Sequence, residues 1–211
     1  MRDCRKWYQG ALVFGGVAAF LAAGILWASL TSGGQAVAAT SSGWSASANL
    51  DGPAKFTDDG ELIRPEGYRK WTFVGTPVTP NDMNGGEAPF PEFHVVYMDT
   101  ESFEHYEETG EFRDGTMLVK ELISVGSKSA TSGAGYFMGE YIGLEVTIKD
   151  SERFGDEPGS WAYFSFGHEY PLAENASAQP AANCNSCHET SAAEDWVFTQ
   201  YYPVLRAAKG D

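Results

Sequence analysis

A short stretch with two cysteines and a histidine, Cys184-Asn185-Ser186-Cys187-His188, constrains this chain more than any other feature of its sequence. Two thiols spaced three residues apart and followed directly by a histidine form the attachment site of a c-type haem. The thiols bind the porphyrin covalently, and the histidine becomes the proximal ligand of the iron. A zinc site would need four ligands, and a redox dithiol would be expected near the start of a βαβ unit. We therefore predict haem c held by Cys184 and Cys187, with His188 as the iron ligand.

The first 38 residues have the pattern of a secretory signal peptide. Arg2, Arg5 and Lys6 precede an apolar run over residues 11–30, and Ala36-Val37-Ala38 provides an A-x-A cleavage pattern. The apolar run is 20 residues long, which is also enough to cross a bilayer, so an uncleaved inner-membrane anchor is the alternative. Both interpretations place the rest of the chain in the periplasm. That location agrees with haem c, because the haem is attached in an oxidising space outside the cytoplasm.

Acidic residues dominate the exported part of the chain. Three of the 14 basic residues and one of the 29 acidic residues lie within residues 1–38, so the remainder has a net charge of −17 with neutral histidines. This charge disfavours nucleic acids and anionic membranes as partners and favours a basic redox protein. Residues 39–60 are small and polar and are predicted to form a flexible linker, which leaves residues 61–211 as a single haem domain.

The pattern of the remaining residues predicts an α+β fold that is mainly β, an antiparallel sheet with a few short helices. Runs rich in β-branched and aromatic residues predict strands over residues 71–74, 93–98, 117–125, 136–148 and 161–166. A helix is predicted over residues 100–109, between a cap at Asp99 or Thr100 and a terminating Gly110. The haem motif belongs to the C-terminal helical segment. An amphipathic helix is predicted there over residues 191–201, kinked or closed by Pro203.

The position of the haem motif favours an iron with a free coordination site. Residues 189–211 contain no Met or His that could serve as a sixth ligand. The candidates upstream are more typical of core or surface positions, and they are Met83, Met98, Met117, Met138, His94, His105 and His168. An open iron binds or transforms small molecules, whereas a six-coordinate haem mainly carries electrons. The helical cytochromes c′ also carry a C-terminal motif, but the strand-like runs argue against a four-helix bundle.

A lysine interrupts an apolar face in the strand predicted over residues 117–125. Alternation places Lys120 on one face with Leu118 and Leu122. Burial lowers the pKa of a lysine and makes its neutral, nucleophilic amine accessible. Alternatively, the side chain extends along the sheet margin and keeps its charge in water.

The long strand predicted over residues 136–148 carries glycines on one face and a carboxylate on the other. Glu140 is the only charged residue on its face, where it either lines a pocket or pairs with a base at the sheet margin. Gly135, Gly139 and Gly143 lie on the opposite face and leave a flat track. Another backbone, a second subunit or the edge of the haem could approach closely there.

Several longer blocks of sequence resemble the cytochrome P-460 family. The blocks are Trp71-Thr72-Phe73-Val74-Gly75-Thr76, the segments over residues 88–97, 112–122, 135–140 and 153–164, and the closing Cys-x-x-Cys-His region. They follow one another in the expected order and span roughly residues 61–208. Long ordered blocks are far more specific than the haem motif alone.

The resemblance implies a β-rich c-type cytochrome that forms homodimers and whose five-coordinate haem has a vacant distal face. In the enzymes of this family a lysine is joined to the haem macrocycle at a meso carbon, and the resemblance assigns this crosslink to Lys120. The implied reaction is the oxidation of hydroxylamine to nitrous oxide or nitrosyl products. The electrons would pass to an external acceptor such as a soluble cytochrome.

The resemblance also suggests a distal carboxylate that accepts protons, in the loop just before the haem motif. Glu174 is the only carboxylate of this loop after Glu169, and Gln179 is the candidate for the critical position. An amide does not accept a proton as a carboxylate does, so a Gln179 that faces the iron would weaken oxidase activity. His94 is a further polar candidate for the margin of the pocket.

Two alternatives to an enzyme stay open. A non-catalytic cytochrome similar to cytochrome c′-beta would share the sheet fold but lack the lysine crosslink, and it would bind nitric oxide or another gas. Apolar residues on the distal side, such as Phe90, Phe93 or Phe137, would favour such diatomic ligands. A plain electron carrier would need a sixth protein ligand on the iron.

Overall fold

The computed structural model describes residues 53–210. The predicted signal peptide or anchor, residues 1–38, lies outside the described residues, as does most of the predicted linker. Within the linker range, the ring of Phe56 lies against the rings of Phe154 and Phe164, at centroid distances of 6.3 and 6.2 Å. Among residues 53–210, no helix is both long enough and apolar enough to cross a bilayer.

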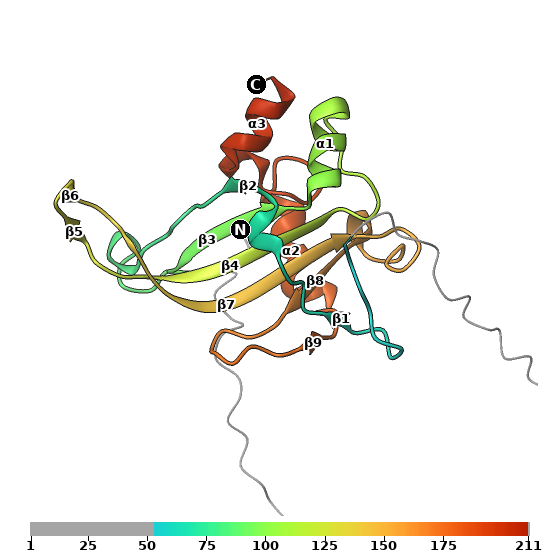
Figure 1. Ribbon diagram of the computed structural model, residues 1–211, viewed down its shortest axis with the longest axis horizontal. Coiled ribbons are helices and arrows are strands. Elements are labelled where there is room, and N and C mark those ends of the chain that lie inside the picture. Colours follow the sequence, from blue (N-terminus) through green and yellow to red (C-terminus); the bar gives the residue numbers. More distant parts are fainter. Residues whose placement is uncertain (1–52, 211) are drawn as a thin grey trace, which may run out of the picture.

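A five-stranded antiparallel sheet forms the centre of the fold (Figure 1). Its strands are, in spatial order, β2 (Thr72–Gly75), β3 (Phe93–Met98), β4 (Met117–Val125), β7 (Met138–Lys149) and β8 (Trp161–Ser165). Two short antiparallel pairs accompany it, β1 (Leu62–Ile63) with β9 (Asn175–Ala176) and β5 (Ser129–Ala130) with β6 (Gly133–Ala134). The predicted α+β class, mainly β and antiparallel, is confirmed.

Three α-helices accompany the sheet, α1 (Thr100–Thr109), α2 (Ala181–Ser191) and α3 (Pro203–Lys209). Helix α1 has the predicted limits, because the Asp99 carboxylate accepts the N–H of Ser102 at 2.9 Å and Gly110 ends the helix with φ 73°. Helices α1 and α3 lie side by side at one end of the sheet (Figure 1). Helix α2 carries the haem motif, which confirms its predicted place in a C-terminal helical segment.

The helix predicted over residues 191–201 is wrong. Residues 194–197 form a tight turn in which the Val197 N–H donates to the Glu194 carbonyl at 2.6 Å. The two central residues, Asp195 and Trp196, have φ angles of 40° and 59°. A left-handed backbone cannot continue a right-handed helix. The last helix begins at Pro203 instead, because the first turn of a helix tolerates the missing N–H of proline.

Side-chain alternation divides the core between the two faces of the sheet, with one large cluster on each face and a smaller one around Phe93, Val95 and Ile123. Met117 and Val119 belong to a cluster that also contains residues of β1, β7, β8 and β9. Leu118 belongs to the other cluster, together with Val96 and residues of α1 and α3. Cys184 of α2 packs against this second cluster. We therefore call the side of the sheet that carries Val96 and Leu118 the α2 face.

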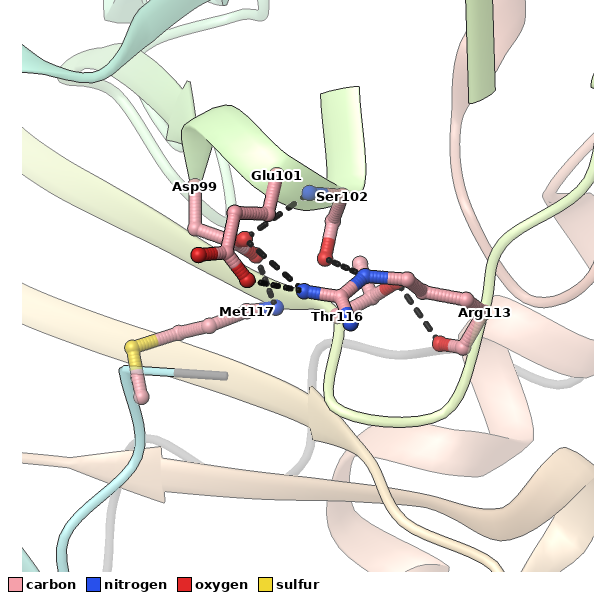
Figure 2. A network of polar contacts seen from close by, with 6 residues as sticks. All are labelled: Asp99, Glu101, Ser102, Arg113, Thr116 and Met117. Carbon is pink, nitrogen blue, oxygen red and sulfur yellow. Dashed lines mark hydrogen bonds and ion pairs between the residues drawn. The ribbon is translucent and has the colours of Figure 1, made fainter. Parts of the chain in front are cut away.

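A polar network anchors the start of β4 to the start of α1 (Figure 2). The buried Asp99 carboxylate caps α1 and also accepts the N–H of Met117 at 2.8 Å. Arg113 donates to the carboxylate of Glu101 at 3.1 Å, and the Thr116 hydroxyl donates to the carbonyl of Arg113 at 2.7 Å. The first residue of β4 is thereby fixed, and with it the pairing register of the strand.

Candidate haem site

The pairing register places Lys120 in a row of side chains that crosses four strands on the α2 face. Val96 of β3 lies opposite Lys120, Lys120 lies opposite Glu145 of β7, and Glu145 lies opposite Ser165 of β8. Directly opposed residues in neighbouring strands point to the same face of a sheet. Lys120 therefore lies on the face that receives Cys184. We call these four residues the Lys120 row.

Lys120 and Glu145 form an ion pair between Nζ and Oε2. Their side chains are 28% and 25% exposed, so the pair is largely shielded from water. Burial alone lowers the pKa of Lys120, but the charge and hydrogen bond of Glu145 raise that pKa above its usual value. Burial likewise acts to raise the pKa of Glu145, yet Lys120 and His168 hold it far below its usual range. The ammonium is thus charged and paired, rather than neutral as burial alone would make it.

His168 reaches the same carboxylate from the loop after β8. Its Nε2 lies 3.2 Å from Oε1 of Glu145, and the hydrogen bond between them raises the pKa of His168 against the effect of burial. Gly143 permits this approach, since a Cβ there would lie 2.8 Å from the Gly167 carbonyl oxygen and 3.2 Å from the His168 Cα. The segment that approaches this glycine is therefore part of the chain's own backbone.

Glu92 and His94 lie at the start of β3, beside the Lys120 row. His94 lies opposite Leu122, and Oε1 of Glu92 is 4.0 Å from its Nε2. That buried nitrogen has no hydrogen-bond partner among residues 53–210. Burial, assisted by the charge of Lys120, lowers the pKa of His94 to about 3, so the ring is neutral. Burial raises the pKa of the Glu92 carboxyl, an effect that Lys120 opposes.

Helix α2 holds His188 in a fixed orientation. Its Nδ1 lies 2.7 Å from the carbonyl oxygen of Trp196. A carbonyl only accepts, so Nδ1 carries the proton and Nε2 keeps its lone pair for a metal. The rings of Tyr163 and Phe198 flank the imidazole, each with its centroid 4.6 Å away. Burial lowers the pKa of His188 to about 4, which keeps the ring in its neutral, metal-binding form.

The turn that supplies the Trp196 carbonyl has a strained backbone. Asp195 and Trp196 both have positive φ, which costs about 1–2 kcal/mol for each non-glycine residue. Lys149 bonds to Asp195 at 2.6 Å. The Trp196 ring packs on Gly159, where a Cβ would lie 2.5 Å from Cε3 of the ring. These two contacts hold the strained turn, and they keep its carbonyl directed at His188.

The residues of α2 fit a c-type haem, because two cysteines share the helix with a histidine whose Nε2 is prepared for iron. The Nε2 of His94, which has no hydrogen-bond partner within residues 53–210, supplies a second polar atom on the same face. The family model for Cytochrome P460 matches residues 65–199. The chain belongs to the cytochrome P460 family. A search of the curated proteins finds no match.

Membership of the cytochrome P460 family makes this protein a haem cytochrome, and the two cysteines of α2 fit its covalent attachment. The structure places Lys120 and His94 on the α2 face of the sheet, but it places Glu174 elsewhere. Glu174 is exposed and directly precedes β9, whose Ala176 packs in the cluster on the opposite face. Gln179 is partly buried, and its N–H donates to the Tyr163 carbonyl at 2.7 Å.

Sequence reasoning missed three members of this cytochrome P460 site, namely Glu92, Glu145 and His168. A signal for Glu92 was available, because it precedes His94 by two residues and strand alternation directs both to one face. Glu140, which was considered instead of Glu145, is exposed. His168 was considered only as an iron ligand, whereas in the structure it contacts Glu145.

Proposed function

We propose that this protein is a periplasmic oxidoreductase that oxidises hydroxylamine at a haem c joined additionally to Lys120. Cys184 and Cys187 would hold the porphyrin, and His188 would bind the iron. The bound haem would supply one-electron redox chemistry and an open coordination site for the substrate nitrogen. The products would be nitrous oxide or nitrosyl compounds, and a soluble cytochrome would take the electrons.

The position of Lys120 carries this proposal. A lysine that bonds to a porphyrin edge must lie on the side of the sheet that receives the haem motif, and Lys120 lies there. Burial raises the pKa of the Cys184 thiol to about 11, and the charges of Glu145 and Lys120 also act on that pKa. The ion pair and the haem motif are therefore near neighbours, although 64 positions separate Lys120 from Cys184 in the sequence.

The residues around Lys120 fix the position of its side chain and determine the charge of the site. Glu145 holds the Lys120 side chain in one place and keeps it on the α2 face. From the turn at residues 194–197, the Trp196 carbonyl fixes the proton of His188 on Nδ1. The rings of Tyr163 and Phe198 cover the imidazole and exclude water from it.

The polar surroundings of Lys120 support an enzyme over the gas-binding alternative. The titratable side chains near Lys120 include those of Glu92, His94, Glu145 and His168. Of the aromatic residues expected to favour diatomic ligands, Phe93 packs in a separate cluster with Val95 and Ile123. Phe90 lies close to the row, with its ring centroid 5.4 Å from Nζ of Lys120.

A homodimer is also part of the proposal. Phe73 and Tyr141 are 43% and 50% exposed. They pair with Tyr97 and Ile123, which pack on the side of the sheet away from α2. Large exposed apolar groups of this kind are typical of surfaces that another subunit covers. Sedimentation of the haem-loaded protein should give twice the chain mass, and a monomer would contradict this part of the proposal.

Turnover of hydroxylamine with a redox dye tests the proposed activity, and Lys120→Arg is the matched variant. Arginine keeps a cation beside Glu145 but is not expected to form the bond to the porphyrin. The wild type should oxidise hydroxylamine and show a red-shifted Soret band when reduced. The variant should keep haem c, show an ordinary c-type spectrum and lose at least about tenfold in kcat. Identical spectra and rates in both proteins would contradict the assigned role of Lys120.

A further inference from the structure

A surface cavity of about 260 Å³ lies beside the start of β3, and Glu92 forms part of its wall. The other charged wall residues, Asp82 and Lys128, neutralise one another through a hydrogen bond of 2.7 Å. Ser124 of β4 and Ile142 of β7 also line the cavity. Glu92 differs from the other charged wall residues because only 8% of its side chain is exposed.

Glu92 connects this cavity with the Lys120 row. Its side chain reaches the α2 face beside His94, and the charge of Lys120 lowers its pKa while burial raises it. The backbone N–H of Glu92 also lowers this pKa, and the carboxylate lies 4.0 Å from the His94 Nε2. That nitrogen also lacks a hydrogen-bond partner within residues 53–210. Two adjacent, buried and incompletely bonded polar groups next to a cavity point to a ligand that both donates and accepts hydrogen bonds.

We propose that Glu92 is the proton acceptor of the reaction and that this cavity is the route by which hydroxylamine reaches it. The inference rests on the proposed function. Removal of two electrons and two protons converts NH2OH into HNO. One proton passes from the substrate to the Glu92 carboxylate and the other to water, and the two electrons pass one at a time to two molecules of the soluble cytochrome acceptor.

The other candidate bases suit this role less well. Lys120 holds the pKa of Glu145 far below its usual range, so that carboxylate has little tendency to take a proton. The pKa of His94 is lowered to about 3, which makes its ring a weak base. Glu174 is exposed, and Gln179 carries an amide. Within residues 53–210, no Lys or Arg pairs with the buried carboxylate of Glu92. A base is most efficient when its pKa approaches the working pH.

Several charged or titratable groups face Glu92 and set its proton affinity. They are His94 from β3, Lys120 from β4, Glu145 from β7, His168 from the loop after β8, and Asp82 and Lys128 around the cavity. A change at Glu92 must therefore be compared with a change of equal charge elsewhere. Glu87→Gln provides this comparison, because Glu87 is an exposed carboxylate of the same loop.

The test compares Glu92→Gln, Glu87→Gln and wild type as full-length, haem-loaded proteins. The first readout is kcat and KM for hydroxylamine between pH 5 and pH 9. In Glu92→Gln, kcat should fall at least about tenfold while KM changes little, and the decline of kcat at acid pH should disappear. The second readout is the affinity of the ferric protein for azide, followed through the Soret band. Loss of a nearby negative charge should tighten azide binding about threefold or more.

Each outcome decides between the proposed function and the role of Glu92. If Glu92→Gln and Glu87→Gln match the wild type in both readouts, the inference is overturned while the proposed function stands. If the wild type does not oxidise hydroxylamine, the proposed function and the proton-acceptor role both fail. Tighter azide binding by Glu92→Gln would then still support the cavity as a ligand route. Glu92→Asp serves if Glu92→Gln does not load haem, and it should lower kcat while leaving azide affinity unchanged. An unchanged kcat in Glu92→Asp would overturn the inference.

Discussion

The two sides of the haem site consist of different kinds of chemical groups. On the side of α2, His188 lies between two aromatic rings, and a backbone carbonyl fixes its Nδ1 proton. On the side of the Lys120 row, Glu145 contacts both Lys120 and His168, and Glu92 lies 4.0 Å from His94. On the first side the histidine is neutral and fixed in place, and the second side contains the charged pair of Lys120 and Glu145.

This difference matches two separate tasks, which are binding of the iron and reaction of the substrate. A proximal ligand works best when its tautomer and orientation do not change, and aromatic packing with a strained turn achieves this. A side that receives substrate must bind polar atoms and move protons, which requires groups that respond to charge and pH. We therefore expect substitutions on the α2 side to affect stability most, and substitutions around Lys120 to affect pH dependence and activity.

The largest effect on stability is expected from Gly159→Ala on the α2 side. The new Cβ would lie 2.5 Å from the Trp196 ring, on a backbone with φ 65°. Strain and overpacking together should lower the free energy of unfolding by about 2–4 kcal/mol in urea titrations. Gly60→Ala is the control, since φ is 83° there and a Cβ would meet nothing within 4 Å. Equal losses in the two variants would show that the Trp196 turn is not tightly held.

The next effect is the difference between Lys120→Met and Lys120→Arg. Neither variant is expected to bond to the porphyrin, so the comparison isolates the charge beside Glu145. The pair is about three-quarters buried. The free energy of unfolding of Lys120→Met should therefore be about 1–3 kcal/mol lower than that of Lys120→Arg at pH 7. Chemical unfolding of the two haem-loaded variants measures this. If they are equally stable, the ion pair does not hold the row together.

A smaller effect is expected in how the stability of Glu145→Gln depends on pH. Glu145 raises the pKa of His168 above its usual 6.5, so their pairing stabilises the fold fully below pH 6.5 and weakens as pH rises through the raised pKa. The stability advantage of the wild type over Glu145→Gln should therefore shrink between about pH 6 and pH 9. Unfolding curves at several pH values test this, with His168→Gln as a background that lacks the titrating ring. A pH-independent difference would argue against the His168–Glu145 contact.

The smallest effect is expected from Lys128→Met, at the cavity beside Glu92. Lys128 and Asp82 form an exposed ion pair, with side chains 59% and 43% exposed. Exposed pairs contribute little because water and salt screen them. The thermal midpoint should match the wild type at low and at high salt. A clear loss of stability would mean that the cavity wall matters to the fold as well as to ligand access.

Most of the fold could be predicted from local patterns. The strand faces of residues 117–125 follow from alternation, and the limits of α1 follow from Asp99 and Gly110. The tight turn at residues 194–197 could not be predicted, because neither Asp195 nor Trp196 is a glycine. Their left-handed backbone depends on Lys149 and Gly159, which are distant in sequence.

The partner of Lys120 depends on details of strand pairing that sequence patterns do not contain. A regular hairpin that continued the pairing of Ala130 with Gly133 would place Lys120 opposite Gly143. Two register shifts between Leu122 and Val125 each add a residue on β7, so Glu145 lies opposite Lys120 instead. A shift of two residues preserves the face of the sheet but replaces a glycine with a carboxylate.

The mass of the haem-bearing fragment after proteolysis tests the central claim most directly. If Lys120 and α2 share one haem, the peptide that contains Lys120 and the peptide that contains Cys184, Cys187 and His188 will appear together as a single species with the porphyrin. If the haem is found with the α2 peptide alone and the Lys120 peptide has its unmodified mass, the crosslink does not exist. The proposed enzyme would then lose its main support.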